Sequence, residues 1–317
     1  MNADAATIHK LQPHLPIIEK IQVRLAIVLA LAAGYWLLWP MLAPPDPQGP
    51  VAFLPHGRLG ELALLAAGVW AMTALAGAIT LFSRCEAAML GGMAVALGVA
   101  CHSGSAGTLL QYNVDRLPAT FRELSAETAA MAAVAAGAAV VAHMVQRLLR
   151  PMVPDWVRRS EPAAIAAPTG AKAKAAGKDA PVKASRLVNY GGALLMQLVI
   201  ALPLLTFLCR DTARGQVLFA LGASFFLAAM ATHQVFPVRP AAMFWLPPLL
   251  VGTLVLAMGG QPAEPGPDWY LALMVRKSVP LRAALPIDWL AAGAGGGLLG
   301  LWVSLRIHDN RRQEDQQ

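Results

Sequence analysis

Four arginines are the strongest candidates for chemistry in this sequence of 317 residues. They are Arg116, Arg122, Arg276 and Arg282. The first and third are 160 positions apart, and so are the second and fourth. Because guanidinium groups bind carboxylates and phosphates through paired hydrogen bonds, a matched set predicts a site for an anion such as a lipid headgroup. The alternative, which we favour, is that they extend into the membrane interface with Asp115 and Glu123 as local partners.

Few other polar side chains lie inside apolar segments. Gln197 falls in the middle of one, where we expect a hydrogen bond to a neighbouring helix. His143 and His233 share the depth that axial ligands of a haem would need, but nothing in the sequence makes them face each other, and we favour two interfacial histidines. The segment "HSGSAGT" at 102–108 lacks the spacing of a serine nucleophile motif, and we interpret it as a flexible connection.

The sequence gives no basis for an enzyme. It has no HExxH or CxxC spacing, so we expect no metal and no cofactor. We also expect no well-buried Asp, Glu, Lys or Arg in the apolar segments, which argues against a proton-coupled pump. Cys101 and Cys209 both fall near the outer ends of apolar segments, and whether they form a disulfide stays open.

The composition is that of an integral membrane protein. Hydrophobic residues make up 57% of the chain and charged residues only 14%, whereas soluble domains are about a quarter charged. The apolar residues are grouped in eight segments near 23–43, 60–82, 87–103, 126–146, 188–209, 216–234, 241–259 and 286–306. Each is close to the roughly 20 residues that cross a bilayer as a helix, although the third is short. The net charge of +7 lies between these segments, so we expect no nucleic-acid partner.

The distribution of lysine and arginine predicts the orientation. With the N-terminus inside, 17 of the 25 basic residues face the cytoplasm and 8 face outward, which places both termini in the cytoplasm of a bacterial-type cell. The predicted division is a cytoplasmic leader at 1–22, four spans at 23–147, a basic disordered linker at 148–187, four spans at 188–306 and a polar tail at 307–317. The leader contains Pro13 and Pro16, which argue against one continuous helix.

The two sets of four spans resemble each other. The segments "LFSRCEAAML" at 81–90 and "VFPVRPAAMF" at 235–244 share residues at an offset of 154, and Gly137 and Gly297 match at an offset of 160. We therefore expect an all-α fold of two parallel four-helix repeats, since an even number of spans leaves both copies pointing the same way. Coincidence in a chain rich in Ala and Leu is the alternative.

Small residues indicate how the helices pack. Spans four and eight are rich in Ala and Gly, and small residues allow close approach of helices in lipid. The expected packing glycines are Gly137, Gly296, Gly297 and Gly300. We predict that these two spans lie centrally and pack on each other, or form a homodimer face. The function expected is a non-catalytic subunit or scaffold of a complex in the inner membrane, with lipid and a membrane-protein partner. The alternative is a transporter or lipid-handling protein with an outer site between the repeats.

Overall fold

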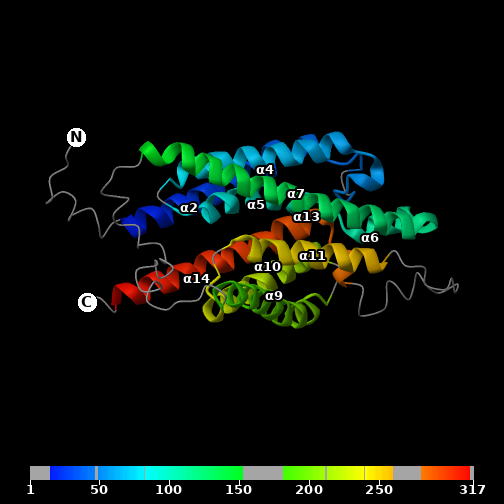
Figure 1. Cartoon of the computed structure of the whole chain (residues 1–317). Coiled ribbons are helices and arrows are strands. Elements are labelled where there is room, and N and C mark those ends of the chain that lie inside the picture. Colours follow the sequence, from blue (N-terminus) through cyan, green and yellow to red (C-terminus); the bar gives the residue numbers. More distant parts are fainter. Residues whose placement is uncertain are drawn as a thin grey trace.

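The computed structural model is all-helical and contains eight helices long and apolar enough to cross a membrane (Figure 1). The structure describes residues 15–46, 49–81, 83–152, 181–210, 213–238, 240–259 and 280–314. Most of the predicted basic linker, the first 14 residues and Arg276 therefore lie outside the described residues. In Figure 1 the four spans of the first half form one layer and those of the second half form the other.

The first half contains four spans. The first span is α2 (Leu15–Ala32), continued by the π-helix η2 (Ala33–Leu38) and by α3 (Trp39–Leu42). The other three are α4 (Leu59–Ile79), α5 (Cys85–His102) and α7 (Leu117–Leu149). Shorter helices lie in its connections and after its last span: η3 (Leu54–His56), α6 (Ala106–Tyr112), η4 (Val114–Arg116) and η5 (Arg150–Met152).

The second half contains the other four spans. They are α9 (Pro181–Leu208), α10 (Arg214–Val235), α11 (Ala242–Gly259) and a last span built from α13 (Pro286–Asp288), η8 (Trp289–Ala294, a π-helix) and α14 (Gly295–Glu314). The short η7 (Pro280–Ala283) precedes this last span. Prolines lie inside α9 and α11, and both helices continue past them.

The short third span is a helix of crossing length and lies in the centre of the bundle. In α5, 14 of the 18 residues are buried, and the helix lies between α2 and α4 on one side and the second half on the other. This central position explains why the apolar segment at 87–103 is short. A helix surrounded by protein needs small residues for close packing, whereas a helix that faces lipid needs large apolar side chains. A side chain at Gly98 would come within 2.4 Å of the Leu31 carbonyl oxygen, so α5 and α2 touch backbone to backbone.

The expected contact between spans four and eight is limited to the start of span eight, where α13 and η8 lie against α7. Span eight packs mainly on α10 and, across the seam, on α5, whereas α7 packs mainly along α11 and α4. The reason is visible at Gly137, where an added Cβ would lie 2.5 Å from Nε1 of Trp70. The small residues of α7 therefore admit a large ring from α4 instead of a second helix backbone.

The glycines of span eight serve contacts within the second half. An added Cβ on Gly296 or Gly300 would lie within 2.4 or 2.3 Å of a carbonyl oxygen of α10, and one on Gly297 within 2.1 Å of the Phe244 oxygen in α11. The pair at 296 and 300 thus lets α14 approach α10 more closely than any side chain would permit.

The start of the first span and the end of the last span lie on the same face of the bundle. Glu19, near the start of α2, lies 2.8 Å from Arg306 near the end of α14, and its carboxylate accepts a hydrogen bond of 2.6 Å from Ser83. We call this face the inner end. The opposite face, which carries residues 43–46, 49–58, 103–116 and 280–285, is the outer end. The helix α2 begins at Leu15, eight residues before the predicted span, so Pro16 falls in its first turn, where proline is tolerated.

The connection before span four, which carries Arg116 and Arg122, is partly helix that runs in line with the span. With 33 residues, α7 is about 50 Å long at 1.5 Å per residue, which exceeds the roughly 30 Å of bilayer hydrocarbon. Its first turns, including Arg122, therefore continue the span instead of forming a separate interfacial element.

Candidate functional site

The most polar buried region lies at the outer end, where two acidic side chains are fully enclosed. Glu127 of α7 and Asp288 of α13 are both 0% exposed. The expectation that the apolar segments contain no well-buried Asp, Glu, Lys or Arg is therefore wrong. The two residues fall in the second and third positions of the predicted segments 126–146 and 286–306. Their position in the sequence could have drawn attention to them, because they are 161 residues apart, close to the offset of 160 at which Gly137 and Gly297 coincide.

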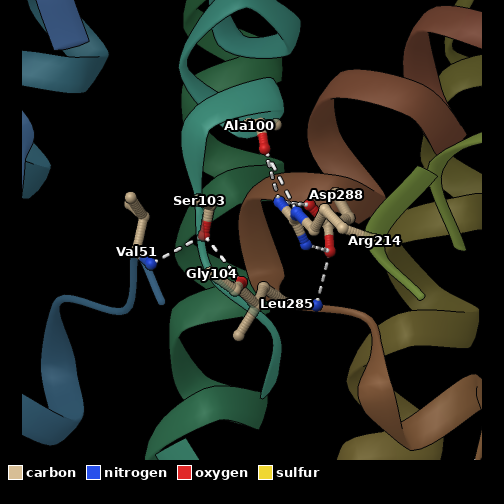
Figure 2. Close-up of polar contacts among 7 residues, drawn as sticks. All are labelled: Val51, Ala100, Ser103, Gly104, Arg214, Leu285 and Asp288. Carbon is tan, nitrogen blue, oxygen red and sulfur yellow. Dashed lines mark hydrogen bonds and ion pairs between the residues drawn. The ribbon is translucent and has the colours of Figure 1, made fainter. Parts of the chain in front are cut away.

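Asp288 is held by an arginine from the start of span six. Both of its carboxylate oxygens receive hydrogen bonds from the guanidinium of Arg214, the first residue of α10, and one of them also accepts a bond of 2.8 Å from the Leu285 amide (Figure 2). A carboxylate in the first turn of a helix also faces the positive end of the helix dipole. The buried negative charge is thus matched by one positive charge and one backbone donor.

Arg214 also joins the two halves of the molecule. Its Nε and Nη2 donate to the carbonyl oxygen of Ala100 at 3.1 and 2.9 Å (Figure 2). Ala100 lies in the last turn of α5, where unpaired carbonyl groups carry partial negative charge and favour a cation. One side chain therefore links the end of span three, the start of span six and the start of span eight.

Glu127 holds the first outer connection through backbone groups. Its Oε2 accepts hydrogen bonds from the amides of Phe53 and Leu54 at 2.8 and 2.9 Å. Its Oε1 is buried and has no hydrogen-bond partner among the described residues. None of the described lysine, arginine or histidine side chains forms an ion pair with it. Glu127 thus differs from Asp288 in having two neutral donors and no countercharge.

The connection held by Glu127 is itself buried. Residues 49–53 are enclosed, and the amide of Val51 donates to Oγ of Ser103 at 2.8 Å (Figure 2). The amide of Gly104 donates to the Gly49 oxygen at 3.0 Å. Ser105 caps α6 by accepting from the Thr108 amide at 3.4 Å. The segment at 102–108, which we interpreted as a flexible connection, is therefore a hydrogen-bonded junction with both serines engaged.

Arg58 fixes the far end of this connection. Its Nη2 donates to the carbonyl oxygens of Leu42 and Ala43 at 3.2 and 3.1 Å, and its Nε bonds Glu61 at 3.1 Å. Arg58 and Arg214 occupy similar places, since Arg58 precedes span two and Arg214 begins span six. Each donates to carbonyl oxygens at the outer end of an earlier span, Arg58 to span one and Arg214 to span three. Burial and then the nearby Arg58 and Arg116 lower the pKa of His56 below its ordinary value, so this connection disfavours a further positive charge.

The four predicted arginines are only partly described. Arg116, at the end of η4, forms hydrogen bonds of 2.6 and 2.8 Å with Glu123, the local partner that the interfacial interpretation anticipated. Arg122 is exposed on α7, and Arg282 is half-buried in η7, which packs against α6 and α11. Arg276 lies outside the described residues, so the anion site stays a prediction.

The remaining polar candidates occupy separate places. Nε2 of Gln197 donates to the Phe244 oxygen at 3.2 Å, which confirms the predicted hydrogen bond between helices. His143 is exposed on α7, whereas His233 is buried at the inner end with Nδ1 2.9 Å from Oγ of Ser304. The three cysteines form no disulfide. Among the described residues, no three His, Cys, Asp or Glu side chains come together as a metal ion would require.

Comparison with known proteins adds no assignment, because no family model, curated protein or solved structure matches the chain. The fold and the buried polar region therefore define it as a polytopic α-helical membrane protein, and its role has to be argued from the geometry alone.

Proposed function

We propose that this protein is a non-catalytic subunit or scaffold of a membrane complex, in a bacterial inner membrane with both termini in the cytoplasm. The observation that carries the proposal is the way in which the buried polar groups are used. Arg214, Asp288 and Ser103 are all engaged in fixing helix ends and connections. These contacts stabilise one arrangement of the eight spans.

The seam between the two halves supports the same proposal. Oγ of Ser125 in α7 donates to the Thr253 oxygen in α11 at 2.9 Å, and an added Cβ on Gly259 would lie 2.8 Å from the ring of Phe121. On the other side of the seam, a Cβ on Gly295 would lie 3.2 Å from Met93. Side chains fill the described contacts between the halves, whereas a transporter with a site between the repeats would need a cavity there.

The proposed duplication is supported by which spans meet across this seam. Span four packs on span seven, and span three packs on span eight. A two-fold axis that exchanges the halves turns the first pair into the second, since it exchanges span four with eight and span seven with three. Two parallel repeats related by such an axis are an established plan for membrane proteins. The cytoplasmic orientation rests on the distribution of Lys and Arg.

The test is to identify what surrounds the exposed spans in the native membrane. A photo-crosslinking residue at Val199 in α9, which is 61% exposed, should give one dominant protein adduct, and native mass measurement should show that protein at fixed stoichiometry. The same residue at Leu205, which is 0% exposed on the same helix, is the matched control and should give none. A monomer that crosslinks only to lipid at Val199 would contradict the proposal and favour the transporter or lipid-handling alternative.

A further inference from the structure

Glu127 is the only fully buried carboxylate among the described residues whose charge has no opposite charge beside it. The other one, Asp288, is paired with Arg214. Two backbone amides donate to Oε2 of Glu127, and Oε1 is enclosed without a partner. An ionised carboxylate away from water is strongly unfavourable unless it is paired, and the usual resolution is that the group becomes neutral.

We propose that Glu127 is a proton-binding site of this protein, with the proton on Oε1. The hydrogen bonds themselves indicate which oxygen carries it. In a neutral carboxylic acid the carbonyl oxygen keeps two lone pairs, so Oε2 accepts from both Phe53 and Leu54 before and after protonation. Binding converts the carboxylate and one proton into a carboxylic acid, and no other bond changes. The O–H lacks an acceptor among the described residues, but this costs less than a buried unpaired charge.

None of the described charged side chains around this end of α7 forms an ion pair with Glu127. The titratable and charged side chains on the elements around it are His56, Arg58, Glu61, His102, Asp115, Arg116, Arg122, Glu123, Arg282 and Asp288. Arg58 is bound to Glu61 and to two helix carbonyls, and Arg116 is bound to Glu123. The η8 and α11 segments that lie nearby contain no charged residue. No described group is therefore in position to keep Glu127 ionised by forming an ion pair.

The position of Glu127 indicates how the proton reaches it. The residue lies at the outer end of span four, below the connection at residues 49–54, so exchange takes place with the outer side. Ionisable groups inside spans commonly mark proton relays, and their expected absence was the argument from the sequence against a proton-coupled pump. This inference does not depend on the proposed function, since a scaffold subunit and a transporter could both contain such a site.

The experiment is infrared spectroscopy of the full-length protein reconstituted in lipid, titrated from about pH 4 to about pH 9. We expect the carbonyl stretch of one neutral carboxylic acid per chain in an apolar environment, which disappears on titration to the ionised form. Glu127→Gln should abolish the band, and Gln still offers an oxygen to the two amides. Glu123→Gln is the matched control, because Glu123 lies one turn away, is only half-buried and is paired with Arg116, and it should leave the band unchanged.

Three results would overturn the proposal. They are a band that persists in Glu127→Gln, a wild-type protein without any neutral acid band over the whole range, and a carboxylate band that changes with sodium concentration, which would indicate a cation in place of the proton. Labelling the glutamates of the wild-type chain with carbon-13 gives a second readout that needs no variant. The acid band must shift with this label, and a band that does not shift would assign the proton to an aspartate and refute the proposal.

Discussion

The outer ends of the two halves each bury one carboxylate at the start of their fourth span, but the surroundings of the two groups differ. Asp288 is paired with Arg214, which begins the sixth span, whereas Glu127 accepts only backbone amides from the first connection. The first connection between spans is long enough for its described residues 49–54 to fold over the helix ends and present the amides of Phe53 and Leu54. The connection at 209–213 is short, so a side chain of the next helix reaches the carboxylate instead. Connection length therefore decides how a similarly placed charge is compensated.

The strongest test of this comparison is removal of the arginine. Arg214→Met leaves Asp288 ionised and unpaired at 0% exposure, so we expect the free energy of unfolding in detergent to fall by about 3–5 kcal/mol. The double variant Arg214→Met with Asp288→Leu removes both charges and should recover most of the loss. Denaturant titration of the purified variants measures both quantities.

The control for this experiment lies in the same connection. Arg210 is exposed and bonds only its own helix end at Phe207, so Arg210→Met should change the unfolding free energy by no more than about 0.5 kcal/mol. Equal effects of Arg210→Met and Arg214→Met would show that the ion pair does not stabilise the second half. The same conclusion would follow if the double variant lost as much unfolding free energy as Arg214→Met and Asp288→Leu lose together as separate single variants.

The corresponding change in the first half should depend on hydrogen bonding instead of charge. Glu127→Ala leaves the amides of Phe53 and Leu54 without an acceptor, and we expect a loss of about 2–3 kcal/mol. Glu127→Gln keeps an acceptor oxygen and should stay within about 1 kcal/mol of the wild type. Thermal unfolding of the two variants side by side measures the difference, and a Gln variant as damaged as the Ala variant would show that the charge itself is needed.

Glycine contacts offer a smaller comparison between the same two spans. Gly297→Ala would force a Cβ against the backbone oxygen of Phe244, and we expect a loss of about 1–2 kcal/mol. Gly137→Ala meets the Trp70 indole, which as a side chain can move more easily, so its loss should be smaller. Gly60→Ala has no atom within 4 Å and serves as the control, with no loss expected. A larger loss at Gly137 than at Gly297 would reverse the order of rigidity that the contacts indicate.

The smallest expected effect is a pH dependence confined to the first half. Burial and the neighbouring arginines lower the pKa of His56 in the folded protein, so the unfolded chain binds a proton more readily than the folded chain. The stabilising effect of a neutral His56 is complete above its ordinary pKa of about 6.5 and is lost as the pH falls through that value towards the lowered pKa. Melting temperatures measured from about pH 7.5 to about pH 5 should show a slightly weaker acid dependence in His56→Gln than in the wild type. A steeper dependence in the variant would mean that His56 is stabilised as a cation.

The number and approximate extent of the spans could be read from the sequence, because crossing a bilayer as a helix requires about 20 apolar residues whatever surrounds them. All eight segments, including the short third one, correspond to helices of crossing length. The contact of Gln197 was also foreseeable, since a buried amide needs a partner. Helix starts were less predictable: α2 begins at Leu15 and α7 at Leu117, because polar turns can continue a helix beyond the hydrocarbon.

The sequence by itself determined that this chain is a bundle of eight membrane-crossing helices, since that result depends on local apolar length. The tertiary structure decided which helix is central and which polar groups matter. Both α7 and α5 are rich in small residues in the sequence. In the structure, however, Gly137 of α7 packs against the ring of Trp70, whereas α5 packs against helices of the second half. Glu127 and Asp288 likewise look like acids at the ends of spans. Only packing encloses them, and only the neighbouring connections decide that one is paired with an arginine while the other is left with a single unpartnered oxygen.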